Sequence, residues 1–513
     1  MTMNVYPYPE SYWLASAPLP SYPSLQASVD AEVAVIGGGI AGITTAYLLA
    51  RAGKQVVLAT AGKLLGGTTG HTTAKITAQH DLIYADLIRR FGEEQARLYY
   101  EANAEGLRFM RETVRELGID CDFRDEEAIV YATCERQAER LRAEYEAYAK
   151  LGIPGEWRER LALPFAARGG LAMKDQARFH PVPYLAKLAE AFVRLGGRIY
   201  EETTIETVEE GEPSIAVTAD GAKIACENIV SCAHFPVFET GLFFARLHAE
   251  SSYVVAARVP GEHPKGMYIS AGEPKRSIRS VAFGGEELLL IGGETHKTGQ
   301  GINTVEHYEA LEAWARETFG AAAFPYRWSA NDFITLDRLP YIGRATRKRP
   351  HSFVATGFRK WGMTTGTAAA LLLRDLLTGR SSRYEALFAP SRFHAPDVKP
   401  LVAENAGAAK HYIQGKLEWL GRKPEELNRD EGALVRVNGR KAGAYVDADG
   451  TLHLVDATCT HMGCEVEWNS GDRTWDCPCH GSRFDYRGRV AEGPATEPLS
   501  ELRAAPPVPK PAR

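Results

Sequence analysis

The feature that most limits how this chain can fold is a group of cysteines and histidines near its C-terminal end. Four of the eight cysteines lie between positions 459 and 479, and the other four are scattered. In a chain expected in the cytoplasm, such crowding favours metal ligation over a disulfide scaffold. The group comprises Cys459, His461, Cys464, Cys477, Cys479 and His480.

The spacing within this group indicates which metal centre it forms. The motif is Cys-x-His, then fifteen intervening residues, then Cys-x-x-His, with one further cysteine in each half. Two cysteines and two histidines are the ligand set of a Rieske [2Fe–2S] centre, in which thiolates bind one iron and imidazoles bind the other. A structural zinc site uses the same residue types, but it does not need this order with two further cysteines. We therefore expect an iron–sulfur cluster.

Residues 421–505 resemble Rieske domains, on the basis of these two motifs and a Gly493-Pro494-Ala495 loop behind them. The resemblance implies a small all-β domain, and short strand patterns at turn spacing agree with it. It also implies a disulfide between Cys464 and Cys479. The cluster ligands that it implies are Cys459 and Cys477 on one iron and His461 and His480 on the other.

Two residues near the second motif bear on the reduction potential of the cluster. In this resemblance, Ser482 matches a hydroxyl that donates to a bridging sulfide in high-potential Rieske proteins, whereas Phe484 stands where those proteins often have tyrosine. The loss of one such hydrogen bond lowers the potential. We therefore expect an intermediate potential.

A separate motif, rich in glycine and unrelated to the cysteine and histidine motifs, lies near the N-terminus. The run Gly-Gly-Gly-Ile-Ala-Gly follows an expected strand, Ala31–Ile36, and opens an expected helix, Ile40–Ala52. This is the dinucleotide pattern G-x-G-x-x-G in its strand–turn–helix context, which disfavours a βα turn without a ligand. We expect Gly37 to make the tight turn, Gly39 to let the backbone approach a pyrophosphate, and Gly42 to let helix and strand pack closely.

Strand and helix patterns alternate along the first part of the chain and predict a mixed α/β domain. Three prolines between Pro390 and Leu401 predict a linker, and the segment Ala406–Leu420 predicts a connecting helix. We therefore expect a large domain at 1–395, a linker and helix at 396–420, and the small domain at 421–505. Among the expected elements are the strand Val56–Ala59, helical spacing over Asp81–Leu117 with a break at Gly92, the helices Thr133–Leu151 and Pro183–Leu195, and the strands Tyr253–Val259 and Leu288–Ile291.

Residues 1–390 resemble the FAD-dependent glycine and D-amino acid oxidase (DAO) family, which includes the sarcosine and dimethylglycine dehydrogenases. Besides the glycine motif, the resemblance rests on the runs Asp337–Gly343 and Ala355–Thr364, which are similar to the family's C-terminal FAD segment. It implies an α/β FAD-binding domain of Rossmann-like, glutathione-reductase/DAO type, with an α+β substrate subdomain. The cofactor contacts that it implies in this segment are Asp337, Gly357, Trp361, Gly362 and Met363.

The resemblance implies further contacts with the cofactor. Where an acidic residue would accept a hydrogen bond from the adenosine ribose, this chain has Thr60, which can hydrogen-bond without charge. The loop 66–74 looks like the Gly-Thr-Thr-Trp-His loop of sarcosine and dimethylglycine dehydrogenases, in which the histidine carries covalently attached FAD. Its matching residues are Thr68, Thr69 and His71, with glycine in place of tryptophan. Covalent attachment at His71 and non-covalent contact both stay open.

The two halves together predict a redox enzyme. A flavin accepts two electrons as a hydride and a Rieske centre carries one, so we expect substrate oxidation at FAD followed by two single-electron exits through the cluster. The family resemblance implies that the substrate is a small amine or an N-methylated or D-amino acid. His296 and Lys360 are the candidate catalytic residues, for substrate contact or proton transfer. The expected electron acceptor is a quinone or a soluble carrier.

Three other functions are alternatives to this hypothesis. A Rieske oxygenase needs a mononuclear iron held by two histidines and a carboxylate, and we find no close histidine pair outside the cluster motif. A reductase fed by NAD(P)H needs a nucleotide site, whereas the single fingerprint is used by FAD. An electron-transfer or redox-sensing protein with little turnover of its own stays open, and it differs from an enzyme in that no small molecule bleaches its flavin.

The composition argues against two kinds of partner. Lys+Arg number 60 and Asp+Glu number 65, a formal net charge of −5, so no basic excess supports nucleic-acid binding. No uninterrupted apolar stretch approaches the length of a membrane span. Because residues Met1–Glu10 show no signal-peptide pattern, we expect the protein in the cytoplasm.

Overall fold

The computed structural model describes residues 8–238, 241–301, 303–392, 397–417 and 422–503. The chain divides into two compact units, which we describe separately. The large unit comprises Glu10–Thr295 and His307–Val398, and the small unit comprises Met1–Pro9, His296–Glu306 and Lys399–Arg513. The segment 296–306 thus belongs to the small unit, although it lies within the stretch 1–395 that the sequence analysis treats as one domain.

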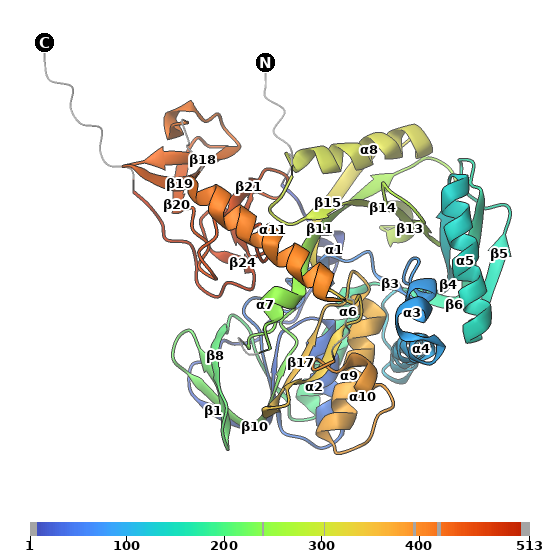
Figure 1. Cartoon of the computed structure of the whole chain (residues 1–513), viewed down its shortest axis with the longest axis horizontal. Coiled ribbons are helices and arrows are strands. Elements are labelled where there is room, and N and C mark those ends of the chain that lie inside the picture. Colours follow the sequence, from blue (N-terminus) through green and yellow to red (C-terminus); the bar gives the residue numbers. More distant parts are fainter. Residues whose placement is uncertain (1–7, 239–240, 302, 393–396, 418–421, 504–513) are drawn as a thin grey trace, which may run out of the picture. The chain divides into compact units, whose positions relative to one another are not determined.

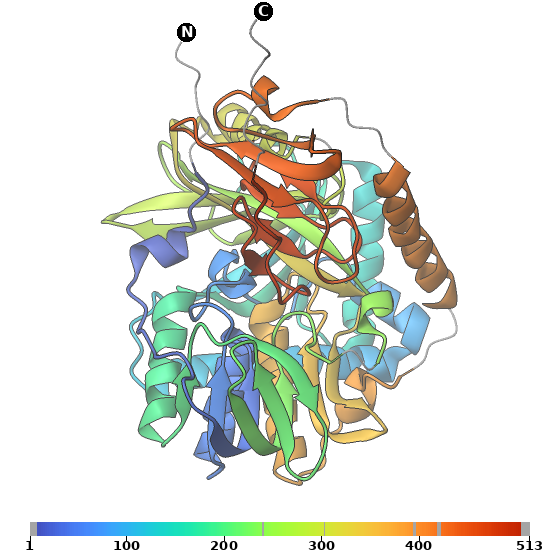
Figure 2. The ribbon, with the colours of Figure 1, turned by 90° about the vertical axis from the view of Figure 1, so that its left-hand side faces the viewer.

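The first sheet of the large unit is built around parallel strands. Its strands are β1 (Val29–Ile36), β2 (Val56–Ala59), β7 (Arg198–Tyr200), β8 (Ile205–Glu209), β9 (Ser214–Thr218), β10 (Lys223–Ser231), β16 (Tyr341–Thr346) and β17 (Arg349–Thr356). The order is β16-β17-β10-β1-β2-β7, and β9 and β8 extend the sheet from β10. The register pairs Ile36 with Ser231 and Ala59, so the carboxyl ends of β1, β10 and β2 meet at one edge. Figure 2 shows the blue β1 beside the green β10.

Helices pack around this sheet. The helix α2 (Ile40–Arg51) is buried along nearly its whole length and contacts α6 (Pro181–Arg194) and α9 (Gly362–Leu377). The break predicted at Gly92 is confirmed, because Gly92 has φ +86° and separates α3 (Tyr84–Phe91) from α4 (Glu93–Glu116). Further helices of the chain are α1 (Tyr12–Ser16), η1 (Thr68–His71), α7 (Phe243–Arg246), α8 (Val305–Phe319) and α10 (Glu385–Phe388).

The second sheet of the large unit is mainly antiparallel. Its strands are β3 (Lys75–Ile76), β4 (Arg124–Ala132), β5 (Gly155–Arg158), β6 (Gly169–Arg178), β11 (Leu247–Arg258), β12 (Met267–Ser270), β13 (Arg276–Phe283), β14 (Glu286–Lys297) and β15 (Ala323–Thr335). They follow the order β15-β11-β14-β13-β12-β4-β6-β3, with β5 beside β6. Figure 1 shows the predicted helix α5 (Glu135–Leu151) beside β4, β5 and β6. One sheet with a parallel centre and a second, largely antiparallel sheet match the expected α/β plus α+β architecture.

The connecting helix begins earlier than the sequence analysis expects. Helix α11 spans Val398–Leu417, whereas the prediction placed its start at Ala406, after a proline linker. Pro400 falls in the first turn of α11, where a missing N–H group costs no intrahelical hydrogen bond. The positions 393–396 of the predicted linker and 418–420 of the predicted helix lie outside the described residues.

The small unit contains two antiparallel sheets, as the prediction of an all-β domain requires. The strands of the first sheet are β18 (Glu431–Val437), β19 (Arg440–Val446) and β20 (Leu452–Asp456), after the short helix η3 (Pro424–Glu426). Those of the second sheet are β21 (Glu467–Asn469), β22 (Thr474–Asp476), β23 (Arg483–Asp485) and β24 (Val490–Glu492). Trp475 and Phe484 are fully buried between loops and strands of this unit.

Hydropathy along the helices bears on the membrane prediction. Over the part of the chain that the structure describes, no helix is both long enough and apolar enough to cross a membrane.

Candidate flavin and iron–sulfur sites

The glycine turn joins β1 to α2 at the carboxyl edge of the first sheet. Gly37 has φ +116°, and a Cβ there would stand 2.4 Å from the carbonyl oxygen of Cys232, so only glycine fits. A Cβ on Gly42 would stand 1.8 Å from the carbonyl oxygen of Gly37. Gly39 is the N-cap of α2 and offers no side chain to cap it, so a ligand can approach the helix backbone here. This cradle fits a pyrophosphate at a helix N-terminus.

Two threonines lie against this turn. Thr60 directly follows β2 and is buried, and its hydroxyl would stand 3.0 Å from a Cβ on Gly38. The hydroxyl of Thr69, in η1, accepts a hydrogen bond from the Ile40 amide at 3.1 Å. Both residues expected to contact the cofactor are therefore brought to the glycine turn.

The loop around His71 is fastened through its carbonyl groups. Four side chains donate hydrogen bonds to the consecutive carbonyl oxygens of residues 70–74. The pairs are Ser11 with Gly70, Trp328 with His71 (2.9 Å), Trp13 with Thr72 (2.6 Å), and Arg279 with both Thr73 (3.0 Å) and Ala74 (2.7 Å). His71 Nδ1 lies 2.9 Å from the Gly67 carbonyl oxygen, and the Thr68 hydroxyl donates to the Asn331 carbonyl at 2.9 Å. This fastening holds Thr68 and His71 in defined positions.

The segment expected at the flavin ring contains three residues with left-handed backbone. Gly357, Arg359 and Lys360 have φ of +76°, +50° and +68°. For a non-glycine residue this region costs roughly 1–2 kcal/mol, and such strain concentrates at functional sites. Gly362 and Met363 form the first turn of α9, directly behind this strained turn.

Trp361 is held in place by a buried histidine. Its ring stacks on His80 with centroids 4.8 Å apart and planes 18° from parallel. His80 Nε2 lies 2.8 Å from the Thr77 carbonyl oxygen, and Nδ1 lies 2.6 Å from the Tyr99 hydroxyl. Burial, with a smaller effect of Arg359, lowers the pKa of His80 to about 3, so this imidazole is neutral. Sequence reasoning missed His80, because a lone histidine outside any motif carries no signal.

Asp337 forms a buried ion pair. Its carboxylate accepts two hydrogen bonds from Arg392, at 2.5 and 2.8 Å, and one from the Leu339 amide at 3.0 Å. Burial raises the pKa of Asp337, but Arg392 outweighs this effect and the pKa is lowered overall. Asp337 thus fastens the run 337–343 to the chain near Arg392. A direct contact with the cofactor stays a prediction.

Lys360 is surrounded by carboxylates that the sequence analysis did not identify. Its Nζ lies 3.2 Å from Glu250 Oε2 and donates to the Thr295 hydroxyl at 2.9 Å, and its amide donates to Asp332 Oδ1 at 3.1 Å. Glu250 and Asp332 are directly opposite each other on β11 and β15, so their side chains share one face of the sheet. Because they are far apart in sequence and from Lys360, only strand register brings them together.

These two carboxylates have opposite pKa shifts. Burial raises the pKa of Glu250, but His248 and Lys360 outweigh it and lower the pKa to about 2. Burial raises the pKa of Asp332 to about 6, against the opposing effect of Lys360 and with a contribution from Glu250. Glu250 is therefore a permanent anion, whereas Asp332 can hold a proton near neutral pH.

The structure does not bring the two candidate catalytic residues together within one unit. Lys360 belongs to the large unit, whereas His296, near the end of β14, belongs to the small unit. A role for His296 stays a prediction.

The two cluster loops of the small unit have the same backbone design. Each loop closes with two backbone hydrogen bonds, of 3.0 and 2.8 Å. They run from Gly463 to Cys459 and from Cys459 to Cys464 in the first loop, and from Gly481 to Cys477 and from Cys477 to Ser482 in the second. The two glycines have φ of +75° and +78°, a left-handed conformation that favours glycine.

The four expected ligands converge from these loops. Cys459 and Cys477 are buried and their thiols are hydrogen-bonded to each other, which lowers the pKa of Cys459 to about 7. The rings of His461 and His480 have centroids 5.0 Å apart and are nearly perpendicular. Burial, with His461, lowers the pKa of His480 to about 4, so its imidazole is neutral and able to bind metal. Two thiols and two neighbouring imidazoles fit a [2Fe–2S] cluster.

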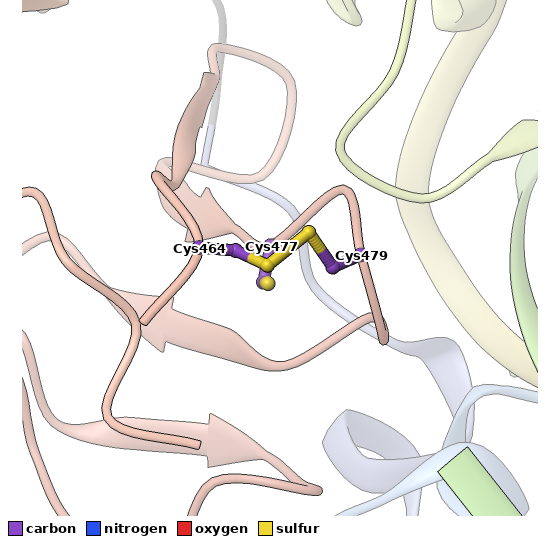
Figure 3. Close-up of side chains that lie close together, drawn as sticks. All are labelled: Cys464, Cys477 and Cys479. Atoms are coloured by element: carbon purple, nitrogen blue, oxygen red, sulfur yellow. A yellow bond between two sulfur atoms is a disulfide. The ribbon is translucent and has the colours of Figure 1, made fainter. Parts of the chain in front are cut away.

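The expected disulfide is present. The sulfur atoms of Cys464, Cys477 and Cys479 lie within 4.8 Å of one another, and Figure 3 shows the three side chains converging. Cys464 and Cys479 are joined by an S–S bond of 2.13 Å, which links the two cluster loops. The disulfide removes two of these sulfurs from metal ligation and leaves the Cys477 thiol.

Ser482 and Phe484 flank the cluster loops. The Ser482 hydroxyl hydrogen-bonds with the Cys459 sulfur and accepts from the Ala495 amide at 3.0 Å. Phe484 is fully buried. Ser482 therefore lies where a hydroxyl can influence the charge on a ligand sulfur.

Comparison with known proteins covers both parts of the chain. Residues 32–376 match the model of the FAD dependent oxidoreductase (DAO) family, and residues 420–504 match the Rieske [2Fe-2S] domain. A Bacillus subtilis (strain 168) protein named as a Rieske 2Fe-2S iron-sulfur protein, YhfW, is 47% identical over 96% of this chain and 97% of its own length.

More distant relatives match the large part of the chain. Gamma-glutamylputrescine oxidoreductase of Escherichia coli (strain K12) is 23% identical over 73% of this chain and 90% of its own length. The solved structure of glycine oxidase from Geobacillus kaustophilus has a TM-score of 0.61 at 21% identity, over 71% of this chain and 99% of its own. The latter likeness shows a shared fold.

Proposed function

Because the chain belongs to the DAO family of FAD-dependent oxidoreductases and carries a Rieske [2Fe–2S] domain, we propose that it is a dehydrogenase of a small amine or an N-methylated or D-amino acid. FAD supplies a two-electron hydride acceptor, and the cluster supplies a one-electron carrier, when they are bound. In this reaction the substrate loses a hydride from the carbon next to nitrogen and a proton from nitrogen, and it leaves as an imine. The two electrons then leave the protein one at a time.

The observation that carries the substrate assignment is the group around Lys360. Glu250 and Asp332 share one sheet face beside the expected flavin segment, and Glu250 and Lys360 are each about a quarter exposed, at 25% and 26%. A permanent carboxylate attracts an ammonium group, which favours an amine over a neutral alcohol as substrate.

Proton transfer requires a group whose pKa is near neutral. Because the pKa of Asp332 is raised to about 6, we propose that Asp332 accepts the proton that the amine must lose. We propose Lys360 as a substrate contact, since its ammonium is held between Glu250 and Thr295.

We propose the following cofactor residues. For FAD they are Gly37, Gly39, Gly42, Thr60, Thr68, Thr69, His71, Gly357, Trp361, Gly362 and Met363. For the cluster they are Cys459, His461, Cys477 and His480. Acid precipitation tests covalent attachment at His71, because flavin found wholly in the supernatant excludes it.

We propose a quinone or a soluble carrier as the electron acceptor, and the cytoplasm as the compartment. Two similar proteins support this class of substrate, because one is named for an amine and the other for an amino acid. They are gamma-glutamylputrescine oxidoreductase and glycine oxidase.

An anaerobic titration tests the proposal. Purified protein is mixed with a panel of N-methylated amino acids, D-amino acids and small amines, and flavin absorbance and the EPR signal of the reduced cluster are recorded together. We expect one class of compound to bleach the flavin and then to produce the cluster signal. If dithionite reduces both centres and no amine reduces either, amine oxidation is wrong, and the protein is an electron carrier or redox sensor.

A further inference from the structure

The connection between β14 and α8 is part of the small unit. The chain leaves the large unit after Thr295, contributes His296–Glu306 to the small unit, and returns to the large unit at His307. Strand β14 ends at Lys297 and α8 begins at Val305, so the described residues of the connection are 298–301 and 303–304. We call these residues the cluster strap.

The first half of the cluster strap lies against the second cluster loop. Gly299 has φ +68°, and a Cβ there would stand 2.6 Å from the Pro478 nitrogen and 2.8 Å from the Cys477 carbonyl carbon. Real Cβ atoms do not approach backbone this closely, so no other residue fits at Gly299 without a shift of the loop. The side chain of Gln300 donates to the Pro478 carbonyl oxygen at 3.1 Å.

The second half of the cluster strap is anchored in the core of the small unit. The buried Thr304 hydroxyl donates to Asn469 Oδ1 at 2.6 Å and accepts from the Gly471 amide at 2.8 Å. The Ser470 hydroxyl donates to Asn303 Oδ1. Both described parts of the cluster strap are therefore bonded to the small unit, the first at Pro478 and the second at Asn469 and Gly471.

Pro478 lies in the second cluster loop between two residues of the expected cluster site. It stands between Cys477, an expected iron ligand, and Cys479, a member of the disulfide. The backbone amides of Cys479 and His480 hydrogen-bond to the Cys477 sulfur. Proline has no backbone N–H group, so Pro478 cannot donate a hydrogen bond that would fix this part of the loop. A neighbouring segment can fix it only by donating to its carbonyl oxygen or by packing against it.

We propose that the cluster strap is a positioning element of the iron–sulfur centre, which holds Pro478 so that the amides of Cys479 and His480 point at the Cys477 sulfur. Such N–H···S bonds stabilise the more negative, reduced cluster and raise its potential. The cluster site is thus completed by residues that the chain supplies from between two elements of the large unit. The last residue before this contribution, Thr295, is the one whose hydroxyl contacts Lys360.

Three variants of the full-length, cofactor-loaded protein test the proposal. Gly299→Ala pushes a methyl group against the loop backbone, and Gln300→Leu removes the hydrogen bond to Pro478 without straining the main chain. The matched control is Gly284→Ala in the β13–β14 turn, where φ is +54° and an added Cβ meets nothing within 4 Å.

The readouts are the midpoint potential of the cluster, from an EPR-monitored redox titration, and the rate of iron release to a chelator. We expect Gly299→Ala and Gln300→Leu to lower the potential and to release iron about fivefold to tenfold faster, the equivalent of about 1–1.4 kcal/mol for one hydrogen bond. We expect Gly284→Ala to match the wild type in both measurements.

Two outcomes overturn the proposal. One is a potential and an iron-release rate that are unchanged in Gln300→Leu, and the other is an equal change in Gly284→Ala. If Gly299→Ala does not fold, Gln300→Leu decides alone. Flavin absorbance, recorded in the same samples, shows whether the large unit still binds its cofactor. Neither readout uses a substrate, so the result does not depend on the amine-oxidation hypothesis.

Discussion

Glu250 and Asp332 are directly opposite each other on the antiparallel strands β11 and β15, and this register places two carboxylates on one face of the sheet. Like charges directly opposite each other on neighbouring strands repel, and a nearby lysine reduces this repulsion here. Lys360 contacts Glu250 with its ammonium and Asp332 with its backbone amide. The result is one permanent anion and one carboxyl group that can exchange a proton.

Replacing Glu250 tests amine binding. We expect Glu250→Gln to lower kcat/KM for the amine substrate by about 10- to 100-fold, because a charge-assisted interaction contributes about 1.5–3 kcal/mol. Anaerobic stopped-flow measurement of flavin bleaching checks this. The exposed Glu286→Gln on β14 is the control and is expected to behave as wild type. Unchanged kcat/KM in Glu250→Gln contradicts the binding role.

The raised pKa of Asp332 predicts that the reaction depends on pH. With a pKa of about 6, its carboxyl group accepts a proton only above that pH, so the rate of flavin reduction rises with pH around 6. We expect Asp332→Asn to slow flavin reduction and to remove this inflection. A wild-type profile that is flat between pH 5 and pH 8, about one unit below and two above that pKa, contradicts the assignment.

Asp332 also predicts a gain in stability on substitution. Because its pKa is raised in the folded state from 3.8 to about 6, ionising it costs folding free energy as pH rises through this window, and the full cost is present above about 6. Asp332→Asn keeps an acceptor for the Lys360 amide and should stabilise the large unit by about 1–3 kcal/mol at pH 7.5, and less at pH 4.5. Thermal release of flavin measures this, with the exposed Asp120→Asn as control. Equal gains at both pH values would sink the argument.

Variants of the expected cluster ligands test whether the cluster can be lost while the flavin stays bound. We expect His480→Ala and Cys459→Ser to lose the EPR signal of the reduced cluster while flavin absorbance is retained, because the two centres use different units of the chain. Cys134→Ser, at an exposed free cysteine of the large unit, is expected to keep both signals. Iron analysis alongside the spectra shows whether the cluster or only its potential has changed.

Ser482 tunes the cluster more gently. We expect Ser482→Ala to assemble a cluster with a potential lower by about 40–60 mV, because about 1 kcal/mol of hydrogen bonding to the reduced form is lost and about 1.4 kcal/mol corresponds to 59 mV for one electron. The redox titration described for the cluster strap measures it. The conservative Ser482→Thr keeps the hydroxyl and is expected to restore most of the potential. A potential unchanged in Ser482→Ala removes Ser482 from the tuning residues.

The glycine turn and the cluster loops could be predicted from the sequence, because the residues that form each of them lie within a short stretch of the chain. The glycine turn needs only a strand, six residues and a helix, and Gly37 and Gly42 are required at their positions by backbone contacts that any such turn makes. The cluster motifs are likewise two loops of the same design, so the spacing of cysteine and histidine already specified an iron–sulfur centre and, through the family resemblance, the Cys464–Cys479 disulfide.

The start of α11 shows where local patterns fail. Three nearby prolines predicted a linker, yet Pro400 is accommodated in a first helical turn, because a proline lacks only a donor that this turn does not use. The correct boundary depends on where the helix begins relative to the proline, which composition does not specify.

The sequence by itself pointed to the two cofactor classes, because the glycine turn and the cluster motifs each lie within a short stretch of the chain. The fold of each part and the Cys464–Cys479 disulfide followed from the family resemblances that these motifs support. Only the tertiary structure decided that Glu250 and Asp332 surround Lys360, that His80 supports Trp361, and that the cluster strap holds Pro478. The physical reason is strand register and packing: a shift of one residue between β11 and β15 would turn the two carboxylates to opposite faces, and nothing in the spacing of either segment alone specifies that register.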